Sequence, residues 1–192
     1  MSGAGIGHNQ GPSMEPGHRW RTHQWRSAQR QLMRKTIPLM IVKMRMKRAA
    51  ELGMDYKTYA SIRQTSGQDI LALMFSSNAL RIIGQGAKMP NAQTRALETV
   101  RAAQKLTLVH APNTPEGVIA ANPVLDAADV APKFNENWSA MRDRVSGLIQ
   151  AQKLPGNTVL VIGDAPMESE WSTAARAGGY LTAAEYFHRG AG

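Results

Sequence analysis

Thr158-Val-Leu-Val-Ile-Gly-Asp-Ala-Pro-Met-Glu-Ser169 is the most informative segment of this 192-residue chain. Five apolar or β-branched residues, Thr158 to Ile162, are followed by Gly163, Asp164 and a run that opens a helix. A buried parallel strand that turns directly into a helix has this pattern. Ligands of open α/β sheets bind outside the carboxyl ends of such strands. Asp164 therefore stands where a site would lie.

Apolar runs and amphipathic helix patterns alternate along the rest of the chain. We predict strands at residues 70–75, 106–110 and 158–162, with a short one at 180–182. We predict helices at residues 91–104, 138–152, 168–177 and 183–188. Residues 111–136 contain four prolines and predict a long loop with a helical turn near 124–129. This alternation implies a small, three-layer, Rossmann-like α/β fold. Its parallel sheet should have three or four strands, with helices on both faces.

The N-terminal third has a different organisation. Residues 1–18 are rich in glycine and predict a disordered tail. Apolar residues then recur at helical spacing, and Pro38 divides them into helices at about 20–36 and 38–52. Gly53 should end the second helix, and Asp55 should cap a third at 56–64. We expect a basic helical extension at 19–66 and an α/β domain at 67–189.

Charge is distributed unevenly between these parts. Residues 1–63 hold twelve Lys/Arg and three acids, a net charge of +9. The remaining eleven basic and eleven acidic residues cancel. This asymmetry indicates an anionic partner for the first third: nucleic acid first, or else a membrane surface or an acidic protein.

The basic residues that we expect to bind this partner lie on helix faces. Arg26, Arg30 and Arg34 are four residues apart and share one face. The second helix carries a similar set, which consists of Lys43, Lys47 and Arg48. The alternative is a solvated basic face that binds nothing.

Other features set limits on partners and compartment. The apolar face of residues 25–44, which includes Met33, Met40 and Met44, is a candidate surface for a protein partner. No apolar run approaches the roughly 20 residues that a helix needs to cross a bilayer, so we expect no membrane span. Cysteine is absent, which is compatible with the cytoplasmic location that we expect.

The order of parts in residues 70–187 resembles a haloacid dehalogenase-type Rossmann domain. The resemblance is carried mainly by Lys153, the strand that ends in Gly163-Asp164, and the run Ala174-Ala-Arg-Ala-Gly-Gly179. In that family the first strand ends in Phe-Asp-x-Asp, where this chain has Phe75-Ser-Ser-Asn78. The second ends in a Ser or Thr that holds phosphate, where this chain has His110, with Asn113 and Thr114 beyond it.

The resemblance implies a hydrolase whose two strand-end aspartates act as nucleophile and general acid/base and help to hold magnesium. Ser76 and Asn78 replace those aspartates, and neither can perform these roles. Asp164 alone is a poor magnesium site and could instead cap a helix, so we expect no cofactor and no metal.

Two functions follow from these residues. The first is a non-catalytic binding or adaptor protein whose basic helices engage nucleic acid or another anionic macromolecule. The alternative is a phosphatase-type hydrolase, or another enzyme of small substrates, with its site at the strand ends. Its candidate residues are Ser76, Asn78, His110 and Asp164.

Overall fold

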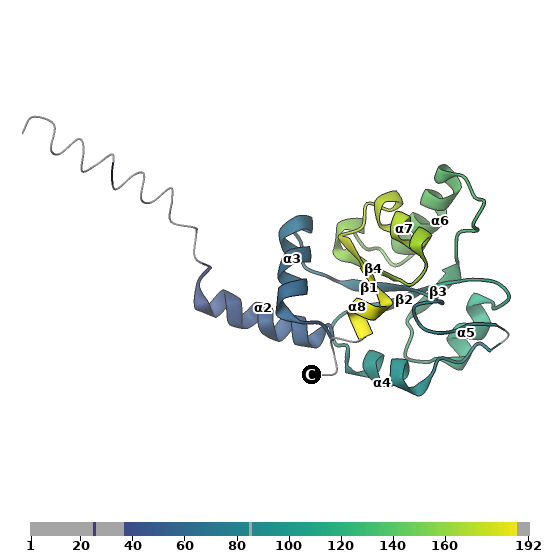
Figure 1. Ribbon diagram of the computed structural model, residues 1–192, viewed down its shortest axis with the longest axis horizontal. Coiled ribbons are helices and arrows are strands. Elements are labelled where there is room, and N and C mark those ends of the chain that lie inside the picture. Colours follow the sequence, from purple (N-terminus) through teal and green to yellow (C-terminus); the bar gives the residue numbers. More distant parts are fainter. Residues whose placement is uncertain (1–24, 26–36, 85, 188–192) are drawn as a thin grey trace, which may run out of the picture. The chain divides into compact units, whose positions relative to one another are not determined.

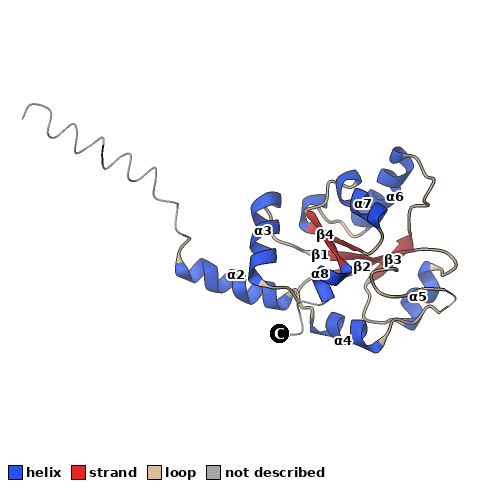
Figure 2. Cartoon of the chain, viewed as in Figure 1, coloured by secondary structure: helices blue, strands red, loops and turns tan. Residues whose placement is uncertain are grey.

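The computed structural model describes Trp25, residues 37–84 and residues 86–187. Its centre is one sheet of five parallel strands, shown in Figures 1 and 2. The strand order is β3-β2-β1-β4-β5. The strands are β1 (Ala72–Ser76), β2 (Gln104–Val109), β3 (Ala127–Val130), β4 (Val159–Gly163) and β5 (Gly179–Thr182).

Helices cover both faces of this sheet, so the predicted three-layer α/β fold is confirmed. The helices are α2 (Leu39–Glu51), α3 (Tyr56–Ser66), α4 (Asn91–Thr99), α5 (Pro115–Ala121), α6 (Trp138–Ala151), α7 (Ser169–Ala174) and α8 (Ala183–Phe187). Two short 3₁₀ turns, η1 (Gly156–Thr158) and η2 (Pro166–Glu168), precede β4 and α7.

The alternation of side chains along β4 explains how one strand supports two cores. Leu160 and Ile162 pack on the face that also receives α3, α4, α5 and α8. Val159 and Val161 pack on the face that receives α6 and α7. Successive side chains of a strand point to opposite faces, and all five residues of β4 are buried. A continuous apolar run is therefore what this position requires.

The interpretation of residues 111–136 as a long loop is wrong. Thr114 caps α5 by accepting a hydrogen bond from the Gly117 N–H, and Pro115 occupies the first helical turn. Residues 127–130, where we expected a helical turn, form β3 at the edge of the sheet. The sheet accordingly has five strands rather than three or four.

The predicted helix at 91–104 is too long by five residues. It ends at Thr99, because Val100 is extended and Ala102 has a positive φ of 54°. The chain needs this short loop to turn back before β2 begins at Gln104.

The helices predicted at 38–52 and 56–64 are confirmed, with ends that differ by at most two residues. Helix α2 begins directly after Pro38, and Gly53 follows its end with a φ of +68°. Asp55 caps α3 through a 2.9 Å hydrogen bond from the Thr58 N–H. The predicted tail at 1–18 lies outside the described residues, as does the predicted helix at 20–36 apart from Trp25.

The end of α2 and one face of α3 belong to the same core as the sheet. Ala49 and Leu52 are buried beside Tyr59 and Ile62 of α3, in the cluster that contains Leu160 and the other residues of that face. The described residues from 40 to 187 form one compact unit. The first half of α2 contributes no buried residue to it.

Candidate functional site

The carboxyl ends of three strands bring the predicted site residues together. Ser76 ends β1, His110 follows β2 and Asp164 follows β4. The strand order reverses between β1 and β4, and such a topological switch point leaves a crevice in which open α/β sheets bind ligands. Asn78 lies in the turn after β1, at the same edge.

Glu168, the last residue of η2, is the centre of this group. Its side chain is almost completely buried, with a residue exposure of 1%. Oε2 accepts a 2.7 Å hydrogen bond from the Ser76 hydroxyl. Oε1 accepts one of 2.8 Å from the Asn78 amide and lies 3.0 Å from Nε2 of His110. Three of the four strand-end candidates therefore converge on one carboxylate.

Backbone groups complete the surroundings of the Glu168 carboxylate. Oε2 also accepts hydrogen bonds from the N–H groups of Asp164, at 2.6 Å, and Ala165, at 3.1 Å. The second of these is the local bond of a capping box, formed across three residues. The carboxylate thus has five neighbouring donor groups, two of which belong to the turn that carries it.

These donors decide the protonation of Glu168. Burial is the largest single influence and alone would raise the pKa of this carboxyl group. The hydrogen bonds from His110, Ser76 and the two backbone N–H groups together outweigh burial, and the pKa lies below its ordinary value. Glu168 is therefore an anion at neutral pH, and Nε2 of His110 must donate to it.

Gly163 makes room for this arrangement. A Cβ atom at this position would lie 2.8 Å from both Cβ and Oε2 of Glu168, and 2.9 Å from Cε2 of Tyr180. Those distances are shorter than van der Waals contact allows. Gly163 is thus required by the close approach of Glu168.

Asp164 has a different partner from the other three candidates. Its carboxylate forms a 2.9 Å ion pair with Arg81, which lies in the turn after β1. Arg81 has a positive φ of 57°, so the backbone bends there to present the side chain. The ion pair connects the loops that follow β1 and β4. Asp164 does not cap a helix, because Ala165 occupies the N-cap position of η2.

The remaining neighbours also hold His110 in place. Its backbone N–H donates to Oγ of Ser77, at 3.1 Å, and its ring lies beside that of Trp171, with centroids 5.6 Å apart. Ser76 Oγ accepts from the Ala79 N–H, at 3.0 Å, while it donates to Glu168. A serine whose proton faces a carboxylate that is itself fully hydrogen-bonded has no free base to activate it.

The donor groups at the strand ends surround a negatively charged group, and that group is the Glu168 carboxylate. Among the described residues, no group of three His, Cys, Asp or Glu side chains has an arrangement that could hold a metal ion.

Sequence reasoning did not assign Glu168 this central position, and it missed Arg81 and Trp171. The position of Glu168, three residues after Ala165 and behind a proline, indicates a helix start and local capping. The sequence holds no sign that Ser76 and His110 converge on the same carboxylate. That convergence depends on the strand order.

The structure places the candidate anion-binding residues in three different situations. Lys43 and Lys47 of α2 are exposed, and no acid among the described residues forms an ion pair with either. Arg48 is largely buried, with a side-chain exposure of 15%. The other three predicted residues, Arg26, Arg30 and Arg34, lie outside the described part of the chain.

The guanidinium group of Arg48 forms all of its hydrogen bonds within the protein. Nε donates to Asp69, at 3.1 Å, and Nη1 lies 3.3 Å from Glu51 and 3.4 Å from the Arg101 carbonyl. Nη2 donates to the carbonyls of Ile70, at 2.6 Å, and Ala102, at 3.1 Å. All five donors of this side chain are thus occupied. Four of these contacts connect α2 to the segments that precede β1 and β2, and the contact with Glu51 lies within α2.

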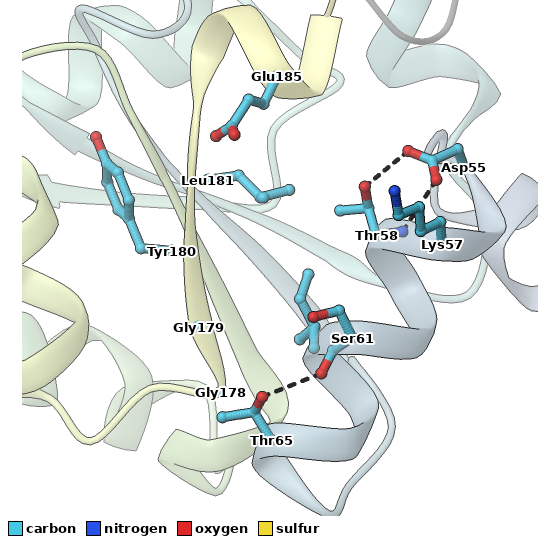
Figure 3. Close-up of a pocket in the computed structure, with 11 residues that line it drawn as sticks. Asp55, Lys57, Thr58, Ser61, Thr65, Gly178, Gly179, Tyr180, Leu181 and Glu185 are labelled. Carbon is cyan, nitrogen blue, oxygen red and sulfur yellow. Dashed lines mark hydrogen bonds between the residues drawn. The ribbon is translucent and has the colours of Figure 1, made fainter.

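A groove of 720 Å³ lies between α3 and the edge strand β5, shown in Figure 3. Thr58, Ser61 and Thr65 line it from α3. Leu181 points towards α3, whereas the Tyr180 ring points away from it (Figure 3). The ring lies beside Gly163, with the Glu168 side chain as its neighbour. The groove and the strand-end cluster are therefore on opposite faces of β5.

Comparison of the chain with known protein families, with curated proteins and with solved structures finds no match. Among the described helices, none combines the length and the apolar character needed to cross a membrane.

Proposed function

We propose that this protein is a non-catalytic binding protein, an adaptor whose basic N-terminal third engages nucleic acid. The observation that carries the proposal is the placement of charge. The whole net charge of +9 belongs to residues 1–63, and the rest of the chain is neutral. A cationic segment of this kind binds the phosphate backbone by releasing condensed counterions.

The described part of this segment leaves its lysines available. Lys43 and Lys47 lie one turn apart on α2, and both are exposed. Arg48 has all five donors engaged within the fold, so we leave it out of the proposed contact surface. Arg26, Arg30 and Arg34 belong to the proposal on the strength of their spacing alone.

The hydrogen bonds of the strand-end residues support the non-catalytic part of the proposal. Ser76, Asn78 and His110 all direct a donor at Glu168. A substrate anion would have to displace a buried carboxylate from these hydrogen bonds, which costs several kcal/mol. The α/β unit then serves as a stable body that carries the basic segment.

Fluorescence anisotropy with labelled single-stranded and duplex oligonucleotides tests this proposal. We expect the full chain to bind both, with affinity that falls steeply as salt is raised. The double variant Lys43→Glu, Lys47→Glu should bind about tenfold or more weakly and show a shallower salt dependence.

A matched control separates specific contacts from net charge. The double variant Lys88→Glu, Lys133→Glu changes net charge by the same amount at exposed positions outside the basic third. It should retain most of the affinity. Equal losses in the two double variants, or no binding by the full chain at low salt, would contradict the proposal.

The alternative, a hydrolase of small phosphorylated substrates, is favoured by one observation. Ser76, Asn78, His110 and Asp164 converge at the topological switch point of the sheet. Hydrolysis of p-nitrophenyl phosphate, with and without magnesium, tests it. Turnover that disappears in a folded Asp164→Ala variant would support the enzyme, and we expect none.

A further inference from the structure

The first eight residues of α2, 39–46, expose an unusual number of large apolar side chains. Residue exposures are 69% at Leu39, 75% at Met40, 41% at Ile41, 67% at Met44 and 53% at Met46. The first buried residue of the helix is Ala49. Soluble proteins seldom expose contiguous apolar groups in this number without a partner.

These side chains do not form a single stripe. Successive residues of a helix point about 100° apart, so Leu39, Met40 and Ile41 project in three directions. Lys43, Arg45 and Lys47 are interleaved with Met44 and Met46, and basic and apolar groups therefore share the same faces of the helix.

Charge identifies the kind of surface that can cover this helix. Residues 16–50 contain ten Lys/Arg and no acidic residue. A second copy of the chain would bring these basic segments together and is opposed by repulsion. The covering surface must therefore be anionic.

The exposed apolar side chains of α2 indicate which kind of anionic surface can cover the helix. A nucleic acid backbone provides nowhere to bury Leu39, Met40 and Met44. A protein partner covers one stripe of a helix and would have to bury the interleaved basic groups without water. Leu39, Met40 and Met44 lie within one arc of about 140° of the helix. The interface of a bilayer can bury such an apolar arc, while the long basic side chains within it extend their charged ends to the phosphates.

We propose that α2 is an interfacial helix that docks on an anionic lipid surface. Leu39, Met40 and Met44 enter the boundary between headgroups and acyl chains, and Lys43 and Lys47 contact lipid phosphates. This surface goes beyond nucleic acid binding, because it uses apolar side chains that a nucleic acid does not need.

The absence of cysteine makes a site-specific test simple. Met40→Cys in the full chain, labelled with an environment-sensitive fluorophore, carries the only thiol. We expect a blue shift and stronger emission with vesicles of phosphatidylcholine and phosphatidylglycerol, but not with phosphatidylcholine alone. Gln150→Cys, an exposed position on α6 at the opposite face of the sheet, should show no shift.

A pair of variants distinguishes lipid docking from nucleic acid binding. The double variant Met40→Gln, Met44→Gln should lose about tenfold in vesicle binding, measured by sedimentation with unlabelled protein, because both side chains lose apolar transfer energy. Its oligonucleotide affinity should be unchanged. Lys43→Glu, Lys47→Glu should weaken both interactions.

Three results would overturn lipid docking. They are no binding to anionic vesicles, equal binding to neutral vesicles, and full vesicle binding by the Met40→Gln, Met44→Gln variant. Oligonucleotide binding without vesicle binding would overturn this inference and leave the proposed function in place. Vesicle binding without oligonucleotide binding would support lipid docking and contradict the proposed nucleic acid binding.

Discussion

At the scale of the residue, Glu168 explains why the strand-end polar groups are where they are. A buried carboxylate without partners is strongly unfavourable, and this one has hydrogen bonds to both oxygens. Its partners Ser76 and Asn78 precede it by 92 and 90 residues, so it joins distant parts of the chain. Glu168 is thus a structural anion in a place where many α/β proteins bind a ligand.

Glu168→Gln should therefore destabilise the fold. The amide nitrogen would face a donor on whichever side it lies, since Oε1 and Oε2 both accept hydrogen bonds. We expect a loss of about 3 kcal/mol in the free energy of unfolding, measured by urea denaturation at pH 7. Glu170→Gln, an exposed acid on the next turn, is the control and should change stability by less than about 0.5 kcal/mol. Equal stability of the two variants would show that the hydrogen bonds to Glu168 are unimportant.

Alanine substitutions at two glycines should change stability in opposite directions. Gly163→Ala should cost about 2 kcal/mol or more, because the new methyl group meets Glu168 and Tyr180 below 3 Å. Gly147→Ala, in the middle of α6, meets nothing within 4 Å and should stabilise the protein by up to about 1 kcal/mol. The midpoints of thermal unfolding should shift in opposite directions. A shift in the same direction would contradict the close approach.

At the scale of the element, α2 is attached to the sheet by Arg48. Four of its five hydrogen bonds reach the segments before β1 and β2, including those to the carbonyls of Ile70 and Ala102, and the fifth is made to Glu51 on the same helix. The other half of the same helix exposes its apolar residues. One end of α2 thus anchors the helix, and the other end is available for a partner.

Arg48→Lys should loosen this attachment. A lysine has three donors at one point and cannot reach five acceptors spread around a planar group. We expect a loss of about 2 kcal/mol, read from urea denaturation, with Arg45→Lys as a nearly neutral control on the same helix. A fully stable Arg48→Lys variant would mean that the guanidinium bonds contribute little.

The elements also show what the sequence could reveal. Strand β4 was recognisable because a strand buried on both faces needs a continuous apolar run. Strand β3 was missed because it lies at the sheet edge, and none of its residues is fully buried. The strand-end residues could be grouped because parallel strands end at one edge. Glu168 could not be placed among them, because its partners are distant in sequence.

At the scale of the whole molecule, the residues that hold the fold together and the residues proposed to bind a partner lie in different parts of the chain. The sheet and its two helical layers hold the strand-end groups in a closed network. The basic third carries all of the net charge. Changes to the network should therefore alter stability, whereas changes to exposed groups of α2 should alter binding. Measurements of both quantities on one set of variants would test this separation.

Acid should unfold the protein partly through two hydrogen-bonded carboxylates, one inside this network and one outside it. The pKa of Glu168 is lowered despite its burial, and that of Glu136 is lowered chiefly by its hydrogen bond with Arg144. The unfolded chain therefore takes up protons at these carboxyl groups at higher pH than the folded chain does. Their contribution is complete above the ordinary value of 4.5 and is lost as pH falls towards the lower folded values.

Urea denaturation of the wild-type chain and of Glu168→Gln between pH 7 and pH 3 measures the share that belongs to Glu168. We expect wild-type stability to fall as pH drops below about 4.5, and the variant, already weaker at pH 7, to fall less steeply. The two curves should converge at low pH, because protonation removes from the wild type the charge that the variant lacks. Parallel curves would mean that Glu168 has the same pKa in the folded and unfolded chain.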